Sequence, residues 1–219
     1  MRFFSLLFFT LFSCSTSLFA EVGVLAGARA GMNISQLRKF EAPLDFKKRV
    51  NLGSDIAAML RIDFNRFIGF QMEVEFSQKG QAWKGSQDSA KYYGKNVLNY
   101  IQFPLLAVAR FGSDKYKAVI QLGPYLAYWS GAYSQTSTQV DKQTRASTNT
   151  KYLFTKDDNR LDIGLTAGLG ANIKVGKGWI EVLTHYNAGF LSTAKKNSTL
   201  PKVYNGNFSL SLGYLYTIK

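Results

Sequence analysis

The only histidine of the chain, His185, could do acid–base chemistry, because Glu181 and Asn187 stand four and two residues from it. In a β-strand these three side chains point to the same face. A histidine oriented by a carboxylate is suited to act as the base of a hydrolase that attacks membrane lipid, if a nucleophile lies within hydrogen-bond reach. The segment HYN places Asn187 where a nucleophilic serine would be needed. We therefore expect His185 to belong to a structural polar network and predict no catalytic residue.

Two carboxylates at strand spacing, Glu73 and Glu75, are the second candidate for acid–base work. They share one face of a strand, and Arg29, Arg61 and Arg110 are available as partners. Enclosed charges are costly to desolvate unless they are paired. We therefore predict ion pairs, with Arg61 as the partner of Glu73 because it lies on the neighbouring strand.

A glycine-rich segment and a lone cysteine complete the search for chemistry. The segment GLTAGLG, residues 164–170, lies inside a predicted strand, whereas a dinucleotide-binding loop joins a strand to a helix. One histidine and one cysteine, Cys14, do not supply the ligand set of a zinc site. The sequence predicts no cofactor and no metal.

Residues 1–20, MRFFSLLFFTLFSCSTSLFA, have the anatomy of a secretory signal: one arginine, an apolar run and small residues up to Ala20. Cleavage after Ala20 leaves one domain, residues 21–219, without cysteine. Cys14 within LFSC could alternatively be a lipoprotein acceptor. The net charge of +13 would suit nucleic acid, but an exported chain does not meet it. We therefore predict no nucleic-acid partner.

Side chains alternate between apolar and polar along most of the remaining chain. In NYIQFPLLAVARF, residues 99–111, the odd positions are almost wholly apolar, and Pro104 would break a helix. We expect a bulge or a lost ladder bond at Pro104, because a closed sheet has no free edge. The same period predicts eight strands, at about 22–35, 52–64, 67–78, 97–111, 115–130, 160–174, 179–191 and 206–218.

The connections between these strands alternate in length. The short ones lie around Asn65-Arg66, Gly112-Ser113-Asp114 and Val175-Gly176-Lys177-Gly178. The long ones lie at roughly 36–51, 79–96, 131–159 and 192–205. An even strand number, with short turns on one side and long loops on the other, is typical of an outer-membrane barrel whose termini both lie in the periplasm. We predict an all-β fold, an eight-stranded antiparallel up-and-down transmembrane β-barrel.

The two faces of the predicted strands differ in charge. One face is apolar and carries no charge, as in Ile163, Leu165 and Ala167. The opposite face carries the residues that we expect to form a polar network in the lumen: Arg29, Arg61, Asp63, Glu73, Glu75, Gln102, Arg110, Lys117, Asp162, Lys174, Glu181 and His185.

Alternation alone is compatible with two kinds of barrel, because a soluble lipocalin-like barrel would enclose the apolar face instead. The polar face carries five basic and five acidic residues, which suits an interior where enclosed ions must pair. The apolar face ends in aromatic residues, such as Tyr116 at the short-turn side and Tyr128 twelve residues later. Twelve residues of tilted strand span roughly 30 Å, close to the apolar band between the aromatic girdles of a membrane barrel. We therefore assign the apolar face to lipid.

Seven segments carry a resemblance to a known family: GARAGMNIS (27–35), EVEFSQKG (73–80), YIQFPLLAVARF (100–111), GPYLAY (123–128), DIGLTAGLGANI (162–173), HYNAGF (185–190) and FSLSLGYLYTIK (208–219). In this order they resemble the PorT-like outer-membrane β-barrel family of Gram-negative bacteria over essentially the whole mature chain. The resemblance implies an eight-stranded barrel in the outer membrane, and PorT itself is linked to the type IX secretion pathway. The chain departs from barrel proteins that finish on an aromatic residue, since it ends in Ile218-Lys219.

Positive charge is concentrated in the four long connections, which carry +10 of the net +13. At the cell surface such loops would meet the phosphates of outer-membrane lipid and lipopolysaccharide, although ordinary solvated loops could have the same composition. Protein partners in the envelope are a further expectation.

The leading hypothesis for function is a small non-enzymatic outer-membrane barrel, structural, adhesive or accessory to an envelope or type IX secretion assembly. The alternatives are an outer-membrane lipid-modifying enzyme and a narrow channel or carrier for a small solute. The interior of an eight-stranded barrel is just filled by its own side chains, so general diffusion through it is not expected.

Overall fold

A computed structural model describes residues 22–39, 46–87, 90–140 and 144–219 of the chain. The expected signal segment, residues 1–20, lies outside the described residues. Within those ranges, no helix is long and apolar enough to cross a membrane. The described residues form ten strands: β1 (Gly23–Ser35), β2 (Phe46–Arg49), β3 (Asn51–Asp63), β4 (Ile68–Gln87), β5 (Ala90–Gly112), β6 (Tyr116–Val140), β7 (Thr144–Lys151), β8 (Leu161–Val175), β9 (Gly178–Ser192) and β10 (Tyr204–Thr217).

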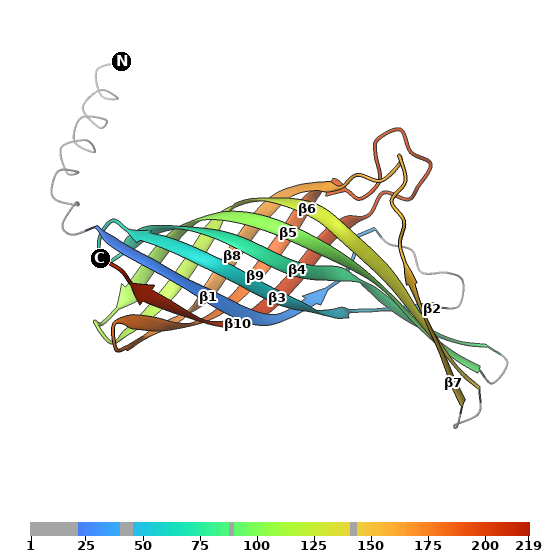
Figure 1. The fold of residues 1–219 in the computed structure, drawn as a ribbon, viewed down its shortest axis with the longest axis horizontal. Helices are drawn as coiled ribbons and strands as arrows, with labels where there is room; N and C mark the ends of the chain where they lie inside the picture. Colours follow the sequence, from blue (N-terminus) through green and yellow to red (C-terminus); the bar gives the residue numbers. More distant parts are fainter. Residues whose placement is uncertain (1–21, 40–45, 88–89, 141–143) are drawn as a thin grey trace, which may run out of the picture.

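Eight of these strands close into a ring, in the order β1, β3, β4, β5, β6, β8, β9, β10, and every neighbouring pair is antiparallel. β10 returns to β1, where the ladder runs from the pair Leu25–Thr217 to the pair Ser35–Asn207. Figure 1 shows the strands winding obliquely around the barrel. The prediction of an eight-stranded antiparallel up-and-down barrel is confirmed.

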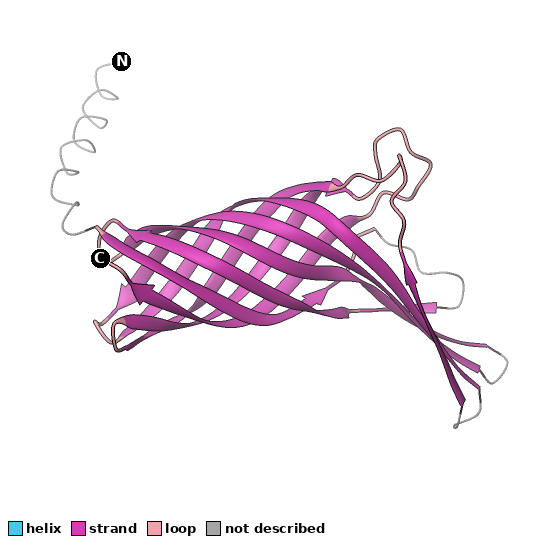
Figure 2. Cartoon of the chain, in the orientation of Figure 1, coloured by secondary structure: helices cyan, strands magenta, loops and turns pink. Residues whose placement is uncertain are grey.

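Short turns gather at one end of the barrel and long connections at the other (Figure 2). In the turn between β3 and β4, the Asn65 side chain accepts hydrogen bonds from the amides of Phe67 and Ile68, at 2.7 and 2.8 Å. The described chain also begins and ends at the short-turn end, where the amide of Val24 donates to the carbonyl of Lys219 at 2.9 Å. The predicted alternation of short and long connections is present.

The barrel wall is apolar outside and polar inside. Leu122, Leu165 and Leu169 are exposed, whereas Gln121 and Thr166, next to them in sequence, are buried. Exposed aromatic residues stand at both ends of the apolar band: Phe64, Phe111, Tyr116 and Tyr216 towards the short turns, and Phe76, Tyr128, Phe190 and Phe208 towards the long connections. An apolar exterior between two aromatic girdles is the surface that a bilayer covers.

Three strands run well beyond the barrel. β4, β5 and β6 have 20, 23 and 25 residues, and β2 and β7 pair with the far ends of β4 and β6. Together they form a protruding sheet, seen at the lower right of Figure 1. We call this sheet the blade and define it as β2, residues 82–87, 90–96 and 133–140, and β7.

The blade corrects the expected connections at 79–96 and 131–159, large parts of which are strand. Backbone pairing continues from Ala82–Lys95 to Gln87–Ala90 between β4 and β5. Hydrophobic alternation occurs where one face of a strand contacts lipid or a core. The blade lies beyond the aromatic girdle, so its strands have no such face. The alternation therefore stops in the sequence, although the backbone pairing continues.

Pro104 points into the barrel from β5 and interrupts one ladder. Between β4 and β5, Met72 pairs with Leu105 and Glu75 with Gln102, and these pairs have the same register on both sides of the gap. Proline has no N–H to donate. The expected loss of ladder pairing is therefore present at Pro104, and on this side it occurs without a bulge.

Candidate functional site

Arg29 stands at the centre of a buried charge cluster in the lumen. Its guanidinium contacts Asp55 on β3 at 2.7 Å, and Glu73 and Glu75 on β4 at 2.8 and 2.9 Å. All four side chains are buried. Because each contact is a charge-assisted hydrogen bond, one arginine compensates part of the charge of three enclosed carboxylates.

The reach of Arg29 depends on small neighbours. β3 lies between β1 and β4, and its residue opposite Arg29 is Ala57, whose methyl group leaves the way to β4 open. On the other side Gly213 of β10 stands opposite, where a Cβ atom would come within 2.8 Å of the Arg29 Cβ. The arginine therefore extends over the strand next to it and binds the second one.

The predicted pair of Glu73 and Arg61 is wrong. Arg61 donates instead to Glu181 on β9 and, at 2.6 Å, to the side-chain oxygen of Gln71. The register gives the reason: Met59 stands opposite Glu73, and Arg61 stands opposite Gln71, two residues nearer the short turns.

Near the short-turn end, Arg110 pairs with Asp63 at 2.5 Å. Lys117 and Lys174 also face the barrel axis there, but both are only partly buried, and each ammonium lies 4.9 Å from the ring centre of Trp179. Among the described residues neither lysine joins an ion pair. These two lysines were predicted as members of the buried network, but they line the mouth of the barrel at the short-turn end.

Lys79 is a buried cation that sequence reasoning missed. Its side chain is 1% exposed, its Nζ donates to Gln102 Oε1 at 2.7 Å, and it lies over the rings of Tyr100 and Tyr125 at 5.2 and 4.8 Å. Cation–π contacts of this kind help an ammonium in a desolvated site. Lys79 was expected in a loop because the visible alternation stops just before it.

Asp162 anchors the next layer towards the long connections. It accepts a hydrogen bond from Asn205 at 2.8 Å and one from the Tyr125 hydroxyl at 3.2 Å, and Asn205 also donates to the Tyr100 hydroxyl at 3.0 Å. Of these, only Asp162 was predicted.

Asp55 was also missing from the predicted lumen network. It stands two residues before Ala57, and this spacing places it on the inward face of β3, so the sequence could have identified it.

His185 is enclosed with neighbours that do not make a catalytic set. Its Nε2 lies 2.7 Å from Gln121 Oε1, and Glu181, the carboxylate expected to orient it, binds Arg61. Ser209 of β10 stands opposite His185, but no hydrogen bond joins the two side chains within the described part of the chain. Both are buried in the lumen, away from the lipid-facing wall. His185 therefore lies in the polar interior of the barrel, beside Gln121.

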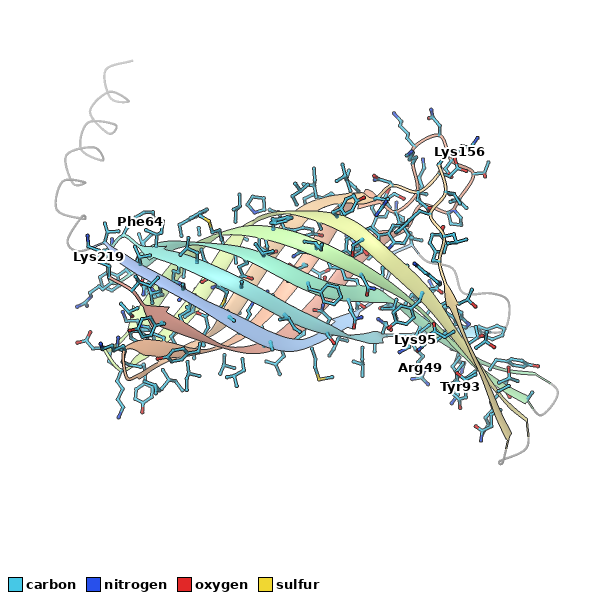
Figure 3. The ribbon with its side chains drawn as sticks, in the orientation of Figure 1. Arg49, Phe64, Tyr93, Lys95, Lys156 and Lys219 are labelled. Carbon is cyan, nitrogen blue, oxygen red and sulfur yellow. The ribbon has the colours of Figure 1, made fainter. Side chains whose placement is uncertain are left out.

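The blade presents a basic face. Its described residues include eight lysines and arginines and no acidic residue. By strand pairing, Arg49, Lys84 and Lys95 share the face that continues the outer barrel wall, together with Tyr93. A concavity of about 420 Å³ on the blade is lined by these four residues among others, and Figure 3 shows three of them close together where the blade leaves the barrel.

Comparison with known families agrees with this architecture. The model of the outer membrane protein beta-barrel domain family matches residues 18–195. The chain belongs to this family. As a member of an outer-membrane barrel family, it resides in the outer membrane of Gram-negative bacteria. No curated protein matches the chain.

Solved structures similar to this barrel have low sequence identity. OprG from Pseudomonas aeruginosa is 11% identical with a TM-score of 0.46, and the match covers 91% of this chain and 96% of OprG. The attachment invasion locus protein Ail of Yersinia pestis, solved with the heparin analogue sucrose octasulfate, is 16% identical with a TM-score of 0.40, over 89% and 99% of the two chains. Neisserial surface protein A is 12% identical with a TM-score of 0.39, over 89% and 98%.

Proposed function

We propose that the chain is a non-enzymatic outer-membrane barrel that anchors the blade at the cell surface and holds its basic face against the phosphates of lipopolysaccharide. The observation that carries this proposal is the blade itself. It continues barrel strands without a break, and Arg49, Lys84 and Lys95 stand on the face that continues the lipid-facing wall. In this orientation both termini lie in the periplasm, as is usual for such barrels.

The position of these cations fits the headgroup region. Phe76 belongs to the girdle on the side of the long connections, and Lys84 follows it by eight residues on the same face of β4. Eight residues of tilted strand rise roughly 20 Å. Cations at that height beyond the apolar band meet the phosphorylated part of an outer leaflet of lipopolysaccharide, where they form charge-assisted contacts.

The lumen supports a structural role in place of a channel or an enzyme. Arg61, Lys79 and Gln102 are fully buried inside the barrel and occupy the path that a solute would need. The only histidine, His185, is buried in the lumen beside Gln121, away from the lipid-facing wall where a lipid substrate would lie. The barrel is therefore proposed as an anchor.

A protein partner is the second candidate, and the edge of the blade favours it. β7 pairs with β6 on one side only, and no other described strand pairs with it. An exposed edge can accept a strand from another protein. A role as an accessory of an envelope or type IX secretion assembly would use this edge.

The lipopolysaccharide proposal is tested by removing three charges at once. Arg49→Gln, Lys84→Gln and Lys95→Gln are combined in one variant, and Lys195→Gln, Lys196→Gln and Lys202→Gln in a control with the same loss of charge. At about 1 kcal/mol for each cation, the blade variant should bind purified lipopolysaccharide on the order of 100-fold more weakly at low salt. The measurement is titration of the purified barrel with intact and dephosphorylated lipopolysaccharide.

The control should bind as the wild type does, and the wild type should prefer the phosphorylated form. Equal losses in both variants, or no preference for phosphate, would contradict the proposal. The protein partner is tested separately with a photo-cross-linking residue at the exposed Asn149 of β7 and a matched one at the exposed Asn197. Capture of one envelope protein from Asn149 alone favours the assembly role, whereas equal capture from both positions or from neither contradicts it.

A further inference from the structure

A pocket of about 370 Å³ lies at the end of the barrel with the long connections. Its walls come from the rim of β5 and β6 and from two connections, residues 152–158 and 193–203. This volume lies within the range of small-molecule sites, which are usually apolar with a few fixed polar groups. The pocket is separate from both the ion pairs of the lumen and the basic face of the blade.

Apolar side chains form most of its wall. Leu98, Trp129, Ala132 and Val203 line it and are buried. Trp129 stacks against the Tyr100 ring with centroids 6.3 Å apart, and beneath it lies the layer that contains Lys79. The pocket therefore ends in an aromatic floor, so a bound molecule would go no further into the barrel.

One carboxylate, Asp158, gives the pocket a negative end. It is 6% exposed and accepts hydrogen bonds from the Tyr152 hydroxyl at 2.9 Å and the Thr155 amide at 2.6 Å. Partial burial, together with Asp158, raises the pKa of Tyr152 to about 12, so its hydroxyl remains a donor further into the alkaline range. These bonds fix the position of the carboxylate without neutralising it.

No cation pairs with Asp158 among the described residues. Arg160, two residues on, donates to the Trp129 carbonyl at 3.0 Å, and its guanidinium lies 4.1 Å from the Phe154 ring centre. Lys195 donates to the carbonyl of Lys156 at 2.6 Å. A buried carboxylate without an ion pair at the end of an aromatic pocket is complementary to an ammonium group.

Backbone hydrogen bonds hold the two connections together before any ligand arrives. The Asn159 amide donates to the Thr193 carbonyl at 2.8 Å, and the Thr193 amide donates to the Val203 carbonyl at 2.9 Å. The Lys195 amide donates to the Asp157 carbonyl at 2.9 Å. A site formed in advance loses less free energy on ordering when it binds.

We propose that this pocket binds a small aromatic amine, with the ring against the apolar wall of Leu98, Trp129 and Ala132 and the ammonium at Asp158. The ligand enters from the side of the long connections and stays at the mouth of the barrel. Binding is independent of the phosphate contacts of the blade.

The test uses three probes with the same ring: 2-phenylethylamine, 2-phenylethanol and phenylacetate. Each is titrated into the mature barrel in lipid nanodiscs, with binding followed by calorimetry and by tryptophan fluorescence. The amine should bind saturably, the alcohol more weakly, and phenylacetate at least tenfold more weakly than the amine. Equal binding of the amine and phenylacetate would overturn the assignment of Asp158 as the ammonium partner.

Two variants locate the site. Ala132→Leu fills the pocket and should weaken the amine at least tenfold, while heat-modifiable migration shows that the barrel still folds. Asp158→Asn should abolish the preference for the amine over the alcohol and leave alcohol binding in place. Wild-type affinity in Ala132→Leu, or no saturable binding of any probe to the wild type, would overturn the site.

Discussion

Ala57 stands directly opposite Arg29 in the ladder between β1 and β3, and this pairing lets the guanidinium cross β3 to reach Glu73 and Glu75. If Arg29 paired only with carboxylates of the neighbouring strand β3, it would contact Asp55 alone. Because the Ala57 methyl group is small, the Arg29 guanidinium reaches past it and links β1, β3 and β4 by ion pairs. These strands are therefore held together by side chains in the lumen as well as by their backbone hydrogen bonds.

The space above Ala57 is therefore essential. Ala57→Leu should lower the free energy of unfolding by about 1–3 kcal/mol, because an added side chain in a packed interior forces its neighbours from their positions. Ala57→Ser, which adds little volume, is the matched control. Denaturant unfolding of the barrel in lipid measures both, and an unchanged stability in Ala57→Leu would show that Arg29 does not depend on this gap.

Arg29 and Glu73 should be energetically coupled. Glu73→Leu alone should cost about 3–5 kcal/mol, because it removes one partner of a buried ion pair. In a double-mutant cycle with Arg29→Leu, the combined loss should differ from the sum of the two single losses by about 0.5–3 kcal/mol. Arg61→Leu with Glu73→Leu is the control cycle, and its coupling should be smaller because only Gln71 connects these residues. A larger coupling to Arg61 would contradict the structure.

The ring of strands and the orientation of its faces could be predicted because hydrocarbon imposes a repeating constraint. Every second residue between the girdles must be apolar, as Leu165 and Leu169 are, and the positions between them are then free to be polar. Contact with lipid therefore produces a sequence period of two in each strand. That period identified Arg29, Glu73 and Asp162 as lumen residues without any structure.

Partners across the lumen could not be predicted in the same way. Which carboxylate Arg29 meets depends on the ladder register and on the size of Ala57, and neither follows from alternation. Lys79 was missed for a related reason, because the lipid constraint ends before the strand does. The blade beyond it has only scattered buried residues such as Ala90 and no contact with hydrocarbon, so backbone pairing reveals it and alternation does not.

The lipid face can be tested by placing the same charge on two adjacent residues of β8. Leu165 is 45% exposed on the outer wall and Thr166 is 2% exposed inside. Leu165→Arg should destabilise the barrel by about 2–4 kcal/mol if it lies near the bilayer midplane. Thr166→Arg avoids that cost, although it disturbs the hydrogen bond from Thr166 to Asn187. Comparing unfolding in bilayers with unfolding in short-chain detergent isolates the lipid contribution, and a lipid-dependent loss at Thr166→Arg alone would reverse the faces.

The Tyr152–Asp158 contact should give the pocket rim a pH dependence in the alkaline range. The pKa of Tyr152 is raised to about 12 from its ordinary value of 10.0, by burial and by the hydrogen bond to Asp158. A raised pKa means that the folded rim favours the protonated hydroxyl, so this stabilisation is complete below pH 10.0 and is lost as the pH rises through about 12. The tyrosinate absorbance of the wild type minus that of Tyr152→Phe should titrate at the upper value. A difference curve centred at the ordinary value would show that the contact is absent in solution.

The channel alternative leads to the last prediction. Arg61, Lys79 and Gln102 are fully buried and project into the lumen at two heights, because Lys79 and Gln102 are hydrogen-bonded to each other. The purified barrel should therefore show no steady single-channel steps in a planar bilayer. Emptying one level with Arg61→Ala and Glu181→Ala should leave it closed, because the Arg29 cluster and the pair of Lys79 and Gln102 still fill the lumen beyond it. Adding Lys79→Ala and Gln102→Ala removes that pair as well, and the barrel should still stay closed, because the Arg29 cluster and the stacked rings of Tyr100 and Trp129 remain in the lumen. Stable steps in the wild type would show that the packed lumen opens, and the barrel would then be a channel.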